Sequence, residues 1–166
     1  MKGQIDLEFM VSLVVFIMAV AYIHVSLSSM IPEHSRMIKR ENLYAKAYAL
    51  SQFLINDPGN PANWTTLETA KRIGLMDERY NKTNLISMTK ATNFCKSYET
   101  FLRKTGINNT VKISIIDLEN VSKLTSLCSP NYNISTPVEV TLRRIVAYEY
   151  DGELRYAEFT VTLWER

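Results

Sequence analysis

The first residue that could do chemistry is a carboxylate at the edge of an apolar run. Glu8 immediately precedes residues 9–27, which form the most hydrophobic stretch of the chain. An ionised carboxylate costs free energy as it approaches hydrocarbon, less at the interface than at the centre of a bilayer. Glu8 therefore needs a cation as a partner, or it must reach the lipid headgroups along its flexible side chain.

The two cysteines, Cys95 and Cys128, allow one disulfide. In a compartment outside the cell, this bond would tie the loop at Cys128 to the helix expected around Cys95 and stabilise the fold. Two reduced, buried cysteines are the alternative. We expect no metal site, because His24 and His34 lie far along the chain from both cysteines.

Five Asn-x-Ser/Thr sequons are candidate glycosylation sites, provided that they are exposed to a transferase. All of them follow the apolar run and fall in expected turns or loops. Their asparagines are Asn63, Asn81, Asn108, Asn120 and Asn133.

Enzymatic and nucleic-acid-binding functions have little support. The chain has 166 residues and a formal net charge of +2, without a block of lysines and arginines. It has no Gly-rich phosphate loop, no His-Glu-x-x-His and no Gly-x-Ser-x-Gly. We therefore expect neither catalysis nor a cofactor, and no nucleic acid as a partner.

The element that must position Glu8 is a membrane-spanning helix. Only Ser12, His24 and Ser26 interrupt residues 9–27. With residues 4–7 added, a helix of about 20 residues spans roughly 30 Å, the thickness of the hydrocarbon core. A cleaved secretory signal would have a shorter apolar core followed by a small-residue cleavage site, and a helix apolar on all faces is unlike a core helix of so small a protein.

The start of the chain, Lys2-Gly3-Gln4-Ile5-Asp6-Leu7-Glu8-Phe9, resembles archaeal type IV pilin-like precursors with a class III signal peptide. Their pattern is a basic residue and Gly, then Gln-x-Ser-x-Glu-Phe leading into the apolar helix. Gly3, Gln4, Glu8 and Phe9 match this pattern. Asp6 stands where the family usually has Ser, which weakens the match to the peptidase recognition sequence.

The resemblance implies that a prepilin peptidase cuts between Gly3 and Gln4 and leaves the apolar helix on the mature protein. The new amine of Gln4 would then be a cation for Glu8, on the same helix or on a neighbouring subunit. Glu8, Gln4 and Phe9 become the expected assembly contact. Further implied partners are sister pilins, the membrane before assembly, and the assembly ATPase with its membrane platform.

The charges flanking the helix leave its orientation open. The resemblance puts Lys2 in the cytoplasm, whereas Arg36, Lys39 and Arg40 on the other side favour the reverse orientation by the positive-inside rule. The sequons and cysteines all follow the helix. They favour a cytoplasmic N-terminus and a head outside the cell.

The helix is expected to continue beyond the membrane. Leu43, Ala47, Leu50 and Leu54 recur at helical spacing and predict one buried face. Pro32 should kink or briefly break the helix, because it removes a backbone hydrogen bond. We expect one bent helix over residues 4–55, like a pilin stalk.

A turn at residues 56–61, rich in Asn, Pro and Gly, ends that helix. The segment from Pro58 to Trp64 and the Ile73-Gly74-Leu75 sequence that follows are also similar to pilin-like heads. We expect Trp64 to pack in the core of the head, and we see no ligand site in this segment.

The rest of the head is predicted to be helices over an antiparallel sheet, an α+β fold. The patterns predict a helix over 87–104 and strands over 111–115, 138–150 and 154–163. Asp151-Gly152 predicts a two-residue hairpin turn that pairs residue 150 with 153. Arg144 interrupts the apolar face of its strand, so we expect a bulge or a sheet edge there.

These observations predict a leader at 1–3, a hydrophobic helix and stalk at 4–55, and an extracellular head at 56–166. The expected function is that of a structural subunit of a surface filament, for adhesion or related surface functions. Two alternatives stay open. One is a minor pilin or pseudopilin of a secretion or uptake machine, and the other is a single-pass membrane protein that displays a binding domain without polymerising.

Overall fold

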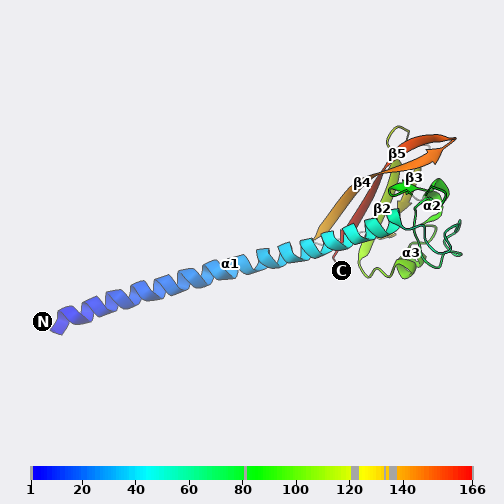
Figure 1. Cartoon of the computed structure of the whole chain (residues 1–166). Helices are drawn as coiled ribbons and strands as arrows, with labels where there is room; N and C mark the ends of the chain where they lie inside the picture. The colour runs from blue at the N-terminus through cyan, green and yellow to red at the C-terminus, as the bar shows by residue number, and fades with distance from the viewer. Residues whose placement is uncertain (1, 81, 121–123, 133, 135–137, 166) are drawn as a thin grey trace. The chain divides into compact units, whose positions relative to one another are not determined.

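A computed structural model describes residues 2–80, 82–120, 124–132, 134 and 138–165. Within this part, a long N-terminal helix is followed by a head with two short helices and five strands (Figure 1). The fold is α+β, as predicted. The helices are α1 (Lys2–Asn56), α2 (Met88–Asn93) and α3 (Tyr98–Thr105), and the strands are β1 (Leu85–Ile86), β2 (Thr110–Asp117), β3 (Thr125–Cys128), β4 (Glu139–Tyr150) and β5 (Glu153–Trp164).

The chain divides into two compact units, one ending at Lys39 and the other running from Arg40 to Arg166. The second unit is called the head below. The last turns of α1 therefore belong to the head.

In the first unit, α1 is exposed on all faces over residues 7–28, with only Ser26 half-buried. It is the one helix of the described chain that is long and apolar enough to cross a membrane, judged by length and composition. The helix is continuous through Pro32, so the expected break there is wrong. A proline removes only one intrahelical hydrogen bond, and the turns on either side keep theirs.

In the head, the row Leu43, Ala47, Leu50 and Leu54 is buried, which confirms the predicted amphipathic face. Tyr44 lies off this row and is about half exposed, at 51%. The last turns of α1 are thus the part of this helix that contributes to a core.

The sheet has the order β1-β4-β5-β2-β3. Its four longer strands are antiparallel, but β1 runs parallel to β4, so the sheet is mixed rather than purely antiparallel. Asp151 and Gly152 have φ angles of 52° and 80°, and Tyr150 pairs with Glu153. The predicted hairpin and its register are confirmed.

One face of the sheet is covered and the other is open. Ala157, Phe159, Val161 and Leu163 of β5 alternate inward into the core that α1 shares. The expected bulge at Arg144 is wrong, because β4 and β5 pair without interruption past it. The edge that we gave as the other option is present at Arg144. Among the described residues, β1 reaches β4 only at Ala147 and Tyr148, so β1 does not cover the stretch of β4 that contains Arg144.

The single helix predicted over 87–104 is wrong, because two helices occupy this segment. The Ser97 hydroxyl accepts a hydrogen bond from the backbone N–H of Thr100, which starts α3 afresh. Gly106, at φ 69°, ends α3 in the left-handed conformation. Phe94 and Phe101 still meet edge to face, with ring centroids 5.8 Å apart, so the apolar spacing that suggested one helix does mark a shared core.

Candidate functional site

The predicted assembly residues lie at the start of α1. Glu8 is exposed, and no residue in the described part of the chain bonds its carboxylate. The Ser12 hydroxyl donates to the Glu8 carbonyl oxygen at 2.9 Å, so this polar group is satisfied within the helix. Phe9 is 66% exposed. The backbone of Gly3 and Gln4 is helical, whereas their side chains lie outside the described part.

The Pro-Gly and Ile-Gly-Leu segments pack against each other at the end of α1. The Trp64 indole N–H donates to the Gly74 carbonyl oxygen at 2.9 Å, and the indole is buried, as predicted. A Cβ on Gly74 would lie 2.1 Å from the carbonyl oxygen of Asp57, so only glycine fits. The backbone N–H of Leu75 donates to the Leu54 carbonyl at 2.7 Å, which satisfies one of the last acceptors of α1.

Lys90 ties these packed segments to α2. Its side chain is 2% exposed and its ammonium lies 2.6 Å from a carboxylate oxygen of Glu78. Three backbone carbonyls also accept from it, those of Pro58, Ala62 and Met76, at 3.0, 2.5 and 3.0 Å. A buried charge is tolerated only when it is paired and hydrogen-bonded in this way. No sequence pattern indicates this site, because most of the groups that bind the Lys90 ammonium are backbone oxygens.

Cys95 and Cys128 form a disulfide, with their Cα atoms 5.3 Å apart. Cys95 lies between α2 and α3, and Cys128 is the last residue of β3. The bond therefore ties the helical segment to an edge strand of the sheet.

A buried carboxylate, Asp117, lies at the end of β2. It accepts hydrogen bonds from the hydroxyl of Tyr148 and from the backbone N–H groups of Asn120 and Glu119. The hydrogen bond from Tyr148, with those backbone bonds, lowers the pKa of Asp117. Burial and the bond to Asp117 raise the pKa of Tyr148. The pair satisfies two polar groups inside the core of the head.

Three of the predicted sequon asparagines, Asn63, Asn108 and Asn120, are exposed and lie in turns or loops. Asn81 and Asn133 lie outside the described residues. The three described sequons therefore lie in turns or loops, as predicted, and their asparagines are exposed.

Two cavities of the head have contrasting linings. The first, called the polar pocket, has a volume of about 410 Å³ and lies where the 63–65 turn, the start of α2 and the hairpin meet. At its rim, Arg79 pairs with Asp77 at 2.6 Å and with Glu149 at 3.3 Å. This hydrogen-bonded pairing with Arg79 lowers the pKa of Asp77.

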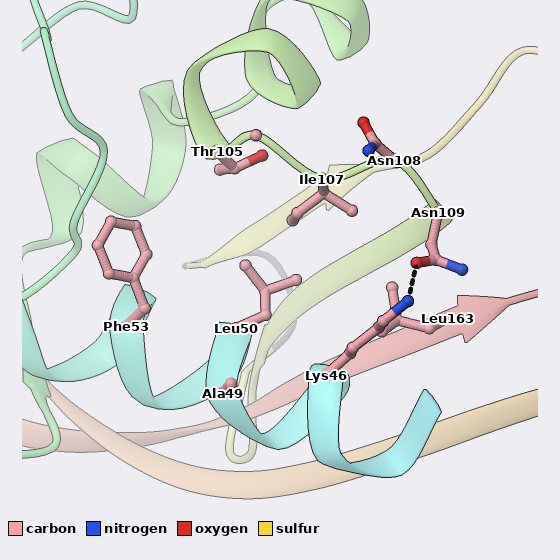
Figure 2. Close-up of a pocket in the computed structure, with 10 residues that line it drawn as sticks. Lys46, Ala49, Leu50, Phe53, Thr105, Ile107, Asn108, Asn109 and Leu163 are labelled. Atoms are coloured by element: carbon pink, nitrogen blue, oxygen red, sulfur yellow. Dashed lines mark hydrogen bonds between the residues drawn. The ribbon is translucent and has the colours of Figure 1, made fainter. Parts of the chain in front are cut away.

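The second cavity, called the apolar groove, also measures about 410 Å³ and lies between α1 and the loop after α3 (Figure 2). Leu50, Phe53 and Leu163 contribute to its lining. At one end Lys46 donates to the side-chain oxygen of Asn109 at 3.1 Å. The Asn108 amide lies on the far side of the loop from α1 in Figure 2.

No group of three or more His, Cys, Asp or Glu side chains among the described residues is arranged to hold a metal ion. The features assembled here are an exposed apolar helix with one carboxylate, a cross-linked head and two cavities. Comparison with protein-family models, with curated proteins and with solved structures found no match.

Proposed function

We propose that this chain is a structural subunit of an archaeal type IV pilus-like surface filament, held together by its N-terminal helices. The observation that carries the proposal is the exposed apolar helix of residues 7–27, followed along the chain by a head that has its own core. An apolar helix of this kind is stable in lipid or among copies of itself. The leader residues Gly3 and Gln4 support cleavage and retention of the helix.

Glu8 gives the proposal its physical mechanism. As a helix leaves the bilayer, neighbouring helices replace the lipid around it, and a carboxylate then needs a cation among them. The amine of Gln4 on a neighbouring subunit is that cation after cleavage. The pair would fix the register between helices, while the heads cover the filament surface and make adhesive contacts.

Mass spectrometry of filaments sheared from cells tests the processing. The mature chain should begin at Gln4, and any other start contradicts cleavage after Gly3. The abundance of the chain in the filaments separates a major subunit from a minor one.

A Glu8→Gln variant tests the assembly contact. We expect normal insertion in the membrane but strongly reduced filaments, measured by electron microscopy and by the amount of sheared protein. Glu33→Gln, an exposed glutamate of the same helix outside the apolar run, is the matched control. Equal filament yields from both variants, or no filament loss on deletion of the gene, favour a membrane-anchored binding domain that does not polymerise.

A further inference from the structure

We propose that the polar pocket seats the carbohydrate attached to Asn63. The inference rests on the proposed function in one respect, namely that the head lies outside the cell, where it meets a glycosyltransferase. Attachment joins the side-chain nitrogen of Asn63 to the anomeric carbon of a phosphate-activated sugar. The nitrogen loses a proton, and the phosphate leaves with the electron pair of the broken C–O bond.

Asn63 is an exposed residue on a fixed turn. It lines the polar pocket, and its amide has no hydrogen-bond partner in the described part of the chain. The backbone N–H of Trp64 donates to the Pro61 carbonyl at 3.2 Å, which closes the turn around Asn63. The buried Trp64 indole anchors that turn to Gly74. A sugar on Asn63 therefore starts from a defined place at the pocket.

The lining of the pocket fits a polyhydroxylated ligand. Several of its polar side chains have no partner among the described residues and keep their full hydrogen-bonding capacity. Hydroxyls both donate and accept, and a carboxylate accepts from sugar hydroxyls. Besides Asn63, these side chains are Thr65, Ser87, Thr89 and Asp151.

The pocket is also preorganised, which reduces the entropy lost when a sugar is held. Lys90, at its base, binds the carbonyls of Pro58 and Ala62 on one side and Glu78 on the other. The wall formed by the 58–65 segment is thereby held against α2.

The sequon at Asn108 provides a contrast within the same molecule. Its amide lies on the far side of the loop from α1 (Figure 2), and the groove beside it is lined by Leu50, Phe53 and Leu163. Asn108 itself lines this groove, but the lining is mostly apolar and offers a sugar few hydrogen-bonding groups, so a sugar on Asn108 serves as the unseated reference.

Periodate oxidation of the glycans on the intact, full-length protein tests the inference, with each site followed by mass spectrometry of glycopeptides. Periodate cleaves vicinal diols only when it can reach them. We expect the sugar at Asn63 to be oxidised roughly thirtyfold more slowly than a sugar at Asn108 or Asn120, which is the factor that two hydrogen bonds of typical net strength supply. Equal rates, or an unmodified Asn63, would overturn the proposal.

A variant of the pocket separates seating from simple crowding. Ser87→Ala with Thr89→Val removes two lining hydroxyls, and Ser87 makes no side-chain cap to α2 that would be lost. We expect the oxidation rate at Asn63 to rise to that of the other sites. Thr92→Val on the same helix is the control and should leave the protection unchanged. Unchanged protection in the double variant contradicts seating.

The outcomes also separate this inference from the proposed function. Modification at Asn108 or Asn120 without modification at Asn63 overturns the seating and leaves the extracellular head in place. An unmodified Asn63 whose pocket instead binds free monosaccharides would make the site a receptor for external sugars, and would overturn the seating too. The absence of any glycan overturns the seating as well, and it leaves the filament function to the tests of processing and of Glu8.

Discussion

At the scale of single residues, Lys90 shows how one charge can organise a loop that has little regular structure. Its ammonium donates hydrogen bonds to oxygens at positions 58, 62, 76 and 78, which lie in loops before β1. These oxygens would repel each other in a dry site without a cation between them. The lysine thus holds together the loops that follow α1, although it belongs to α2.

Lys90→Met keeps the length of the side chain and removes the charge. It leaves Glu78 and three carbonyls without their donor, so we expect a loss of about 3–5 kcal/mol in the free energy of unfolding. Urea unfolding of the detergent-solubilised protein measures it. Lys96→Met, at an exposed lysine near α2, is the matched control. If both variants unfold alike, Lys90 does not hold the loop.

Asp117 predicts a pH dependence of stability. Because its pKa is lowered in the folded state, the unfolded state takes up a proton first as the pH falls. The stabilisation is therefore present above the unfolded pKa of about 3.9 and is lost below it. Asp117→Asn should reduce the loss of unfolding free energy between pH 7 and pH 3, measured with urea. The exposed Asp151→Asn is the control, and an unchanged loss in Asp117→Asn would contradict the argument.

At the scale of elements, the loop that ends α1 depends on close backbone contact at Gly74. A Cβ added at Gly74 would also lie 2.5 Å from the backbone nitrogen of Gly59. Gly74→Ala should therefore cost about 3 kcal/mol of unfolding free energy through overpacking. At Gly106 a Cβ meets no atom within 4 Å and only the φ of 69° is unfavourable, so Gly106→Ala should cost about 1–2 kcal/mol. Chemical denaturation of both variants compares them, and a smaller cost at Gly74 would refute the steric argument.

The elements that could be predicted from sequence are those whose pattern is local. The apolar helix, the row from Leu43 to Leu54 and the Asp151-Gly152 hairpin each carry their own periodicity or turn chemistry. β1 and β3 have only two and four residues, too few to establish an alternation, and β1 is held by a parallel partner distant in sequence. The split at Ser97 was missed because the apolar spacing continues across it into a common core.

The candidate site was predictable only in part. The Asn-x-Thr motif identifies Asn63 as a possible attachment site for a sugar, but it says nothing of the pocket beside it. The pairing of the two cysteines followed from their number. The polar pocket could not be foreseen, because its walls come from the 63–65 turn, α2 and the β-hairpin, which the tertiary fold brings together. The bulge expected at Arg144 was also wrong. The Arg144 guanidinium bonds Ser51 at 3.3 Å and Asn84 at 3.1 Å instead of causing a bulge.

At the scale of the whole molecule, the two units have different requirements. Residues 7–28 bury almost no surface within the chain, whereas the head has a continuous core that includes Leu54, Trp64 and Phe159.

A chain that starts at Arg40 should therefore fold without detergent, elute as a monomer in size-exclusion chromatography and melt at the temperature of the full-length protein. The full-length protein should require detergent or assembly, because its apolar helix has no cover of its own. The truncated head should also be missing from sheared filaments when it is secreted by cells that lack the full-length chain. A truncated head that aggregates or melts far lower would show that the first unit is needed for the fold, which would contradict the division into an assembling helix and an independent head.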